Sequence, residues 1–317
     1  MSTPSAVARL PPAPRGAATA GGGAALRRAV AEGTLGVVGA PFALAATLVE
    51  RSGFDAIYLS GAAFSAGTLG VPDIGLFTLE QLEEQTRILA RAVTIPVIVD
   101  ADTGFGGPDA VAETVRRLEA AGAAAIQLED QVATDKRCGH LAGKQVVETA
   151  EMTAKLAAAA AARRDRDTVI IGRCDARSVL GLDACLARLR AYREAGADWL
   201  FPEALASRAE FAAVGREFAP ATPLLANMTE FGAGPLVPLP DLAAAGFAAV
   251  LYPVTLLRLA MKAMEAGLAV LADEGTQESL LDLMQTREEL YDLLDYDPRH
   301  PERHRAAAPP TAEEHRS

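Results

Sequence analysis

The chain has 317 residues, half of them hydrophobic, which is enough to bury the core of one large globular domain. Its 41 acidic and 30 basic residues leave a formal net charge of −11, which argues against binding to nucleic acid or to an anionic membrane surface. Three cysteines are too few for a disulfide framework, and no apolar run reaches the ~20 residues of a membrane-spanning helix. We therefore expect a protein of the reducing cytoplasm.

The two ends of the chain differ in composition from the rest. Residues 1–24 are rich in Ala, Pro and Gly and contain no acid, which predicts a disordered tail. Residues 298–317 are polar and proline-rich, which predicts a second flexible tail. Residues 25–297 are expected to form a single domain.

Eight short apolar runs alternate with helical patterns along that domain. The runs are residues 35–40, 53–60, 96–100, 122–129, 168–173, 196–203, 223–227 and 246–252. Helical patterns such as 79–92, 110–121, 150–163 and 182–195 separate successive runs, as parallel strands require. Eight such units over roughly 250 residues predict an α/β fold, a (β/α)8 TIM-type barrel with additional C-terminal helices. A doubly wound open sheet is the rival, but no G-x-G-x-x-G follows the first run.

Polar residues stand where the predicted strands end. Because the carboxyl ends of barrel strands form the active-site face, these residues are candidates for one convergent pocket, although any single one could be polar only because it meets solvent. They are Ser60, Gly61, Asp100, Asp102, Glu129, Asp130, Arg173, Asp175, Glu203, Asn227 and Thr229.

Asp100 and Asp102 form the first candidate constellation. They flank a single residue, so in an extended backbone both carboxylates project to the same side. Two close carboxylates attract a cation, and oxygen ligands favour Mg²⁺ or Mn²⁺, with Glu129 from the next strand as a third ligand, direct or through water. The alternative is a pair of solvated or helix-capping aspartates.

Cys138 is the second candidate. It lies in a connection of some 18 residues after the fourth strand, flanked by Lys136 and Arg137, with His140 two residues further on. Neighbouring cations stabilise a thiolate and allow the sulfur to exchange a proton near neutral pH. An incidental thiol on a basic loop is the structural alternative.

Three motifs together resemble the isocitrate lyase and phosphoenolpyruvate mutase superfamily. They are Lys136-Arg-Cys-Gly-His140, Val99-Asp-Ala-Asp-Thr-Gly-Phe-Gly106 and Tyr58-Leu-Ser-Gly61. The resemblance covers about residues 25–297. Two further segments, Phe201-Pro-Glu-Ala204 and Asn227-Met-Thr-Glu-Phe-Gly232, are most similar to the 2-methylisocitrate lyase family within it.

The resemblance implies a Mg²⁺-dependent carbon–carbon lyase that cleaves a small tricarboxylate, 2-methylisocitrate, into pyruvate and succinate in the methylcitrate cycle of propionate catabolism. It implies that Cys138 is the general acid and that Lys136 and His140 belong to the catalytic group. Arg258, with Arg173, Asn227 and Thr229, would supply positive charge and donors. Tyr58 or Arg173 would take the substrate's hydroxyl proton, with Asp73 tuning its neighbour.

The same resemblance leaves other activities open. Isocitrate cleavage and decarboxylation or hydrolysis of oxaloacetate are alternatives within the fold, and a barrel used only for binding is the alternative outside enzymology. The family also implies a homo-oligomer, commonly a tetramer with exchanged C-terminal helices. No nucleic-acid or membrane partner is expected.

Overall fold

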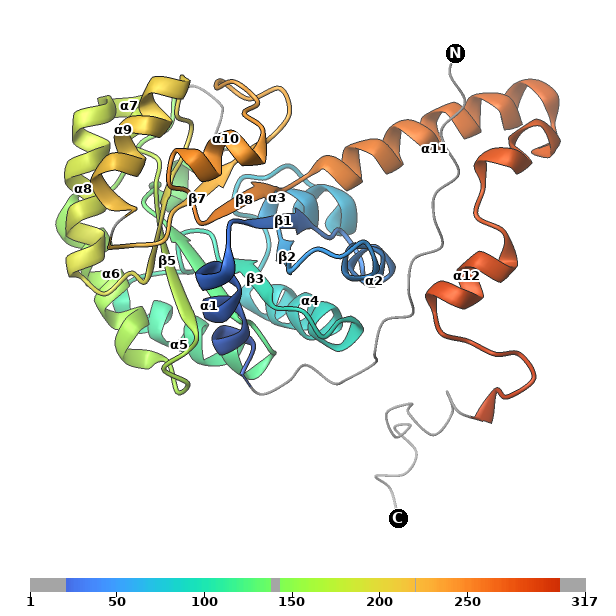
Figure 1. Cartoon of the computed structure of the whole chain (residues 1–317), viewed down its shortest axis with the longest axis horizontal. Helices are drawn as coiled ribbons and strands as arrows, with labels where there is room; N and C mark the ends of the chain where they lie inside the picture. Colours follow the sequence, from blue (N-terminus) through green and yellow to red (C-terminus); the bar gives the residue numbers. More distant parts are fainter. Residues whose placement is uncertain (1–20, 138–142, 220, 303–317) are drawn as a thin grey trace. The chain divides into compact units, whose positions relative to one another are not determined.

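The computed structural model describes residues 21–137, 143–219 and 221–302 (Figure 1). The described residues fall into two compact units, 21–262 and 263–302. The first unit contains a sheet of eight parallel strands. They are β1 Leu35–Gly39, β2 Ala56–Leu59, β3 Val97–Asp100, β4 Ala125–Glu129, β5 Val169–Cys174, β6 Trp199–Pro202, β7 Leu225–Asn227 and β8 Ala249–Tyr252. Each coincides with one of the eight predicted apolar runs.

The sheet closes into a barrel. Its strand order is β6-β5-β4-β3-β2-β1-β8-β7, and all seven of these pairings are parallel. A parallel bridge between Leu200 and Leu224 joins the two ends, and the amide of Leu200 donates to the carbonyl of Pro223 at 3.0 Å. The predicted (β/α)8 barrel is therefore confirmed.

Helices surround the strands, as Figure 1 shows. The longer predicted helices are present within two residues of the expected bounds. The α-helices of this unit are α1 Gly22–Glu32, α2 Ala43–Arg51, α3 Gly61–Phe64, α4 Leu79–Ala92, α5 Pro108–Ala120, α6 Thr149–Ala162, α7 Arg177–Leu180, α8 Leu182–Glu194, α9 Arg208–Phe218 and α10 Leu239–Ala244. A short π-helix, η1 Ser65–Leu69, follows α3, and a short 3-10 helix, η2 Ala133–Asp135, follows β4.

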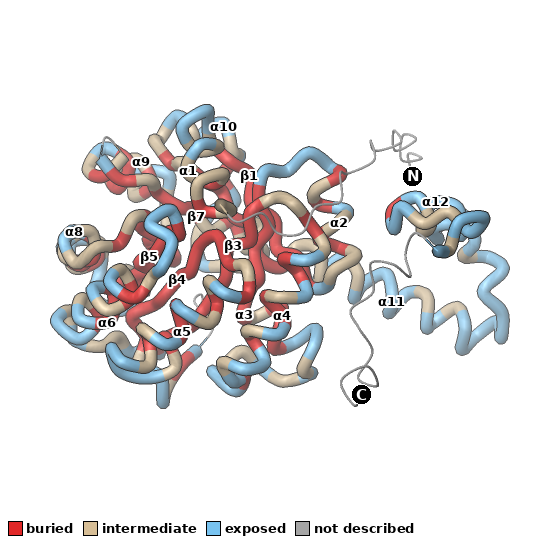
Figure 2. The backbone as a smooth tube through the Cα atoms, turned by 90° about the horizontal axis from the view of Figure 1, so that it is seen from below, coloured by how far each residue is buried: buried red, intermediate tan, exposed pale blue. Residues whose placement is uncertain are grey.

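Alternating residues of each strand divide the apolar core into two layers. In β3, Ile98 belongs to a cluster inside the barrel, whereas Val97 and Val99 belong to a cluster between the strands and the helices. Both faces are covered, which is why the strands are continuous apolar runs rather than alternating ones. Figure 2 shows the burial concentrated along the strands, with the outer sides of the helices exposed.

Helix α1 begins at Gly22, inside the segment assigned to the disordered tail. Its Leu26 is fully buried in the cluster inside the barrel, and its glycines approach residues that precede the strands: a Cβ on Gly23 would lie 2.2 Å from the carbonyl oxygen of Asp167. The helix thus packs near the amino ends of the strands. The prediction of a disordered tail is therefore wrong for residues 22–24, where glycine permits a close approach between backbones.

The C-terminal elements follow β8. Helix α11 Thr255–Glu274 spans the boundary between the two units, and η3 Glu278–Leu283 and α12 Arg287–Leu293 lie in the second. Thr286 and Glu289 form a capping box at the start of α12. Among the described residues, no helix has the length and hydropathy needed to cross a membrane.

Candidate active site

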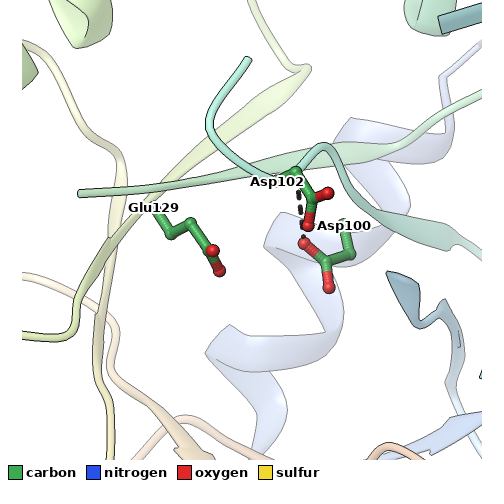
Figure 3. Close-up of side chains that lie close together, drawn as sticks. All are labelled: Asp100, Asp102 and Glu129. Atoms are coloured by element: carbon green, nitrogen blue, oxygen red, sulfur yellow. Dashed lines mark hydrogen bonds between the residues drawn. The ribbon is translucent and has the colours of Figure 1, made fainter. Parts of the chain in front are cut away.

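Three carboxylates meet where β3 and β4 end. Asp100, Asp102 and Glu129 are all buried, and each offers an oxygen within 4.8 Å of the other two (Figure 3). The loop after β3 turns the second aspartate back, because Asp102 has a left-handed φ of 51° and its amide donates to Asp100 Oδ1 at 3.2 Å. Three buried oxygen ligands at this spacing can hold a hard divalent cation.

Burial favours the protonated, neutral form of these three carboxylates as long as no cation is bound to them. It raises the pKa of Asp102 to about 7, and it also raises the pKa values of Asp100 and Glu129. Gly61 borders the cluster: its amide donates to Asp100 Oδ2 at 3.2 Å, and a Cβ there would lie 3.1 Å from that oxygen. The sequence therefore keeps space beside the carboxylates and supplies one donor to them.

Lys136 provides the nearest positive charge. Its Nζ lies 2.6 Å from Asp102 Oδ1 and 2.5 Å from Asp73 Oδ1, and its side chain is only 4% exposed. Burial alone would lower the pKa of Lys136, but Glu129, Asp102 and the other surrounding carboxylates outweigh it and raise the pKa. The lysine is therefore held as a cation against the carboxylate cluster.

Arg173, at the end of β5, is the second buried cation. Its Nε lies 2.9 Å from Asp175 Oδ2 and 3.4 Å from Glu129 Oε2, and its guanidinium lies 5.2 Å from the centre of the Phe201 ring. Burial lowers the pKa of Arg173, but the adjacent carboxylates, Asp175 first, raise it well above its usual value. Arg173 therefore remains charged and oriented toward the cluster.

Neighbouring strands contribute an amide and a further carboxylate. Glu203, which follows β6, is fully buried, and Asn227 at the end of β7 donates through Nδ2 to both of its carboxylate oxygens at 3.2 Å. Glu203 Oε2 is 3.9 Å from Arg173 Nε. Adjacent strand ends thus form one continuous polar surface.

Tyr58 lies on β2, facing the inside of the barrel. Its hydroxyl donates to Gln127 Oε1, and the side chain is almost completely buried. Burial, and to a smaller extent the charge of Asp100, raises the pKa of Tyr58 well above its usual value. The phenol therefore keeps its proton at neutral pH.

Most of these side chains line one open cleft at the carboxyl ends of the strands, whose empty space of about 570 Å³ includes open solvent at its mouth. Its lining contains Tyr58, Ser60, Ala62, Asp73, Asp100, Glu129, Lys136, Arg137, Arg173, Phe201, Glu203, Asn227, Thr229, Leu251, Pro253, Val254 and Arg258. Four acidic and four basic residues are among them. Arg258 is half exposed, with its Nε 3.7 Å from Glu230 Oε2 and its guanidinium 5.3 Å from the centre of the Phe231 ring.

The cleft thus brings together most of the strand-end residues predicted from the sequence, with Gly61 and Asp102 in contact with its carboxylates. Cys138 and His140 lie outside the described residues. Asp175, another of the predicted strand-end residues, lies behind the cleft in contact with Arg173. Lys144, whose Nζ lies 2.5 Å from Asp175 Oδ1, was not among the predicted residues. No local pattern points to Lys144, because its partner Asp175 lies 31 positions further along the chain.

Comparisons with known proteins identify relatives of this chain. Residues 33–272 match the family model described as phosphoenolpyruvate phosphomutase. A curated protein from Aeropyrum pernix named 2-methylisocitrate lyase is 51% identical over 253 residues, covering 79% of this chain and 80% of the relative. Seven further curated relatives, 42–50% identical, carry the same name, two of them as probable members.

Solved structures show the same fold. A 2,3-dimethylmalate lyase of the PEP mutase/isocitrate lyase superfamily aligns with a TM-score of 0.83 at 36% identity, covering 92% of this chain and 96% of that one. A phosphonopyruvate hydrolase solved with oxalate and Mg²⁺ aligns with a TM-score of 0.78 at 32% identity, covering 90% and 97%.

Proposed function

This chain belongs to the phosphoenolpyruvate phosphomutase family as one of its lyases, and we propose that it cleaves 2-methylisocitrate into pyruvate and succinate in a Mg²⁺-dependent reaction. One observation carries the proposal: the buried carboxylates Asp100 and Glu129 line a cleft together with Lys136 and Arg173 at the carboxyl ends of the strands, and Asp102 lies beside them in contact with Lys136. The names of the curated relatives support the choice of substrate.

The residues present fit a magnesium ion. The donors are all carboxylate oxygens, they are buried, and Gly61 leaves space beside them. We assign the metal to Asp100, Asp102 and Glu129, and Mn²⁺ has the same ligand preference. When bound, such an ion lowers the cost of negative charge on the substrate's hydroxyl oxygen.

The cations of the cleft suit a substrate with several carboxylates. Arg173 and Arg258 can each pair with a carboxylate, and Ser60, Asn227 and Thr229 offer hydrogen bonds beside them. These groups lie in a cleft that is also lined by acids, so only an anion that reaches the cations and avoids the carboxylates of the cleft binds well. A tricarboxylate bound together with a divalent cation meets this requirement.

The apolar part of the cleft favours the methylated substrate. Phe201, Leu251, Pro253 and Val254 line it, and Phe201 is fully buried. A methyl group against such a wall contributes roughly 1–3 kcal/mol, or about 10–200-fold in kcat/KM. We therefore expect 2-methylisocitrate to be preferred over isocitrate, with measurable activity on both.

Proton transfer completes the proposed reaction. Loss of the hydroxyl proton and cleavage of the adjacent carbon–carbon bond release pyruvate and leave succinate as a carbanion equivalent, which must take up a proton. We assign that proton to the Cys138 thiol, with His140 two residues later in the sequence and Lys136 as the cation two residues before it. Tyr58 and Arg173 both keep their own protons at neutral pH, so we assign them to holding the substrate's oxygens.

We also propose that the protein is a cytoplasmic homo-oligomer, a tetramer with exchanged C-terminal helices. Apolar side chains of the C-terminal unit support an assembly, since Met264 and Leu268 on α11 are 54% and 66% exposed. Light scattering coupled to gel filtration would give four times the chain mass for the full chain and a smaller species for a chain ending at residue 274. A monomer would contradict this part.

The activity is tested by measuring pyruvate and succinate from 2-methylisocitrate with Mg²⁺ present, beside isocitrate, 2,3-dimethylmalate and oxaloacetate. We expect stoichiometric products and the highest kcat/KM with 2-methylisocitrate. Asp102→Asn is the inactive variant, and Asp109→Asn, the same change on an exposed residue of α5, is its matched control. Cleavage of another substrate at a higher kcat/KM would reject the assignment.

A further inference from the structure

Lys155 is a buried lysine that does not line the cleft, and the barrel fold by itself does not require a lysine at its position. It lies on α6, just before six consecutive alanines, and only 4% of it is exposed. Its Nζ donates to the carbonyl oxygen of Thr103 at 3.2 Å and lies 3.4 Å from Glu151 Oε1 one turn earlier on the helix. Lysine is rarely buried to this extent without a specific partner.

The carbonyl that Lys155 contacts belongs to the loop carrying the second metal-ligand candidate. Within this loop, Asp102 and Phe105 have φ values of 51° and 60°, in the left-handed region that non-glycine residues avoid. Such a conformation costs about 1–3 kcal/mol and persists only where the surroundings enforce it.

Three successive carbonyls of the loop are each held by a different element. That of Asp102 accepts from the amide of Glu129 in β4 at 2.9 Å, and that of Thr103 accepts from Lys155 in α6 at 3.2 Å. That of Gly104 accepts from Thr114 Oγ1 in α5 at 3.3 Å. Of these three donors, Lys155 is the one that carries a charge, and charge-assisted hydrogen bonds are stronger than neutral ones.

We propose that Lys155 is a positioning residue for the metal site. By fixing the Thr103 carbonyl, it holds the peptide plane between Thr103 and Gly104, one residue beyond Asp102, and so keeps the Asp102 carboxylate directed at Asp100 and Glu129. The inference rests on the proposed metal site, but it concerns a residue outside the ligand set. A lysine that only anchored α6 would affect stability and leave metal affinity unchanged.

Titration calorimetry with MgCl₂ on the full chain separates the two roles. Lys155→Met keeps most of the side-chain volume and removes the donor, and we expect it to raise the Kd for Mg²⁺ by about 10-fold or more, the scale seen when partners of metal ligands are removed. Glu151→Gln, which removes the exposed ion-pair partner and leaves the contact to Thr103, is expected to bind within about twofold of the unsubstituted protein.

Further variants keep the test decisive. Lys155→Arg retains N–H donors and is expected to restore most of the affinity, whereas the amide nitrogen of Lys155→Gln is one bond short of the Nζ position and is expected to weaken binding. A folded Lys155→Met that binds Mg²⁺ as tightly as the unsubstituted chain would overturn the proposal. If that variant does not fold, equal affinity of the Gln and Arg variants would do so.

The failure of the metal site itself gives a different result. In that case the unsubstituted protein would show no Mg²⁺ binding at all, and the proposed function would fall together with this inference. A second readout is the Mg²⁺ concentration for half-maximal activity, which should rise in Lys155→Met while kcat at saturating Mg²⁺ changes little.

Discussion

Replacing Asp175 by asparagine tests the charge balance behind the cleft. Asp175 is fully buried and accepts from two cations: Arg173 through Nε at 2.9 Å and Nη2 at 3.2 Å, and Lys144 through Nζ at 2.5 Å. Asparagine keeps the shape but removes the charge, and it turns an N–H group toward one of these donors. Two buried cations then lose their shared counter-ion.

The expected loss of stability is large. Breaking a buried ion pair by removing one partner costs about 3–5 kcal/mol. In a domain of this size each kcal/mol corresponds to roughly 2–4 °C in Tm, so Asp175→Asn should lower Tm by roughly 6–20 °C. Because Arg173 also loses the carboxylate that orients its guanidinium, we expect kcat/KM for 2-methylisocitrate to fall by about 10²-fold.

Thermal denaturation followed by circular dichroism gives the first quantity, and initial rates of pyruvate formation below the Tm of the variant give the second. Asp55→Asn, the same change on an exposed residue before β2, is the matched control and should shift Tm by no more than about 2 °C. The reasoning would be refuted if Asp175→Asn matched this control in both Tm and kcat/KM.

Three other predictions address the chemistry. Cys138→Ser should abolish cleavage and leave Mg²⁺-dependent substrate binding intact, so turnover near that of the unsubstituted enzyme would remove its role as proton donor. EDTA should stop the reaction and excess Mg²⁺ should restore it; activity that survives chelation would exclude the metal. Because burial raises the pKa of Tyr58, its loss of a proton should contribute nothing to the pH profile between about pH 8 and 10. An alkaline decline in that range that disappears in Tyr58→Phe would contradict this assignment.

The barrel was predictable because its signals are local. Each strand is buried on both faces and is therefore a short apolar run, and each crossover needs a helix, so eight repeats of the pattern are visible in one sequence. The polar residue that ends each strand is also a local signal. Given parallel strands in one barrel, these ends must lie on one face, which is why Asp100, Glu129 and Arg173 could be grouped in advance.

Contacts between distant segments were beyond this reasoning. The ion pair of Lys136 with Asp73, the shared carboxylate of Asp175 and the contact of Lys155 with the Thr103 carbonyl each join residues whose side-chain directions depend on packing. The pattern around Lys155 is an alanine-rich helix, which reveals helix propensity and nothing about a partner 52 positions away. The start of α1 was missed for the same reason, since its glycines acquire meaning only against Asp167.

The apolar periodicity that predicts helices and strands is averaged over many residues. The sequence alone was therefore sufficient to predict the number, order and direction of the strands. The metal affinity and the geometry of the site depend instead on the positions of individual atoms to within a few tenths of an ångström. Folding brings Lys136 and Arg173 together with a cluster of three buried carboxylates, and the removal of these carboxylates from water shifts their pKa values upward. That electrostatic environment exists only once the barrel has closed around it.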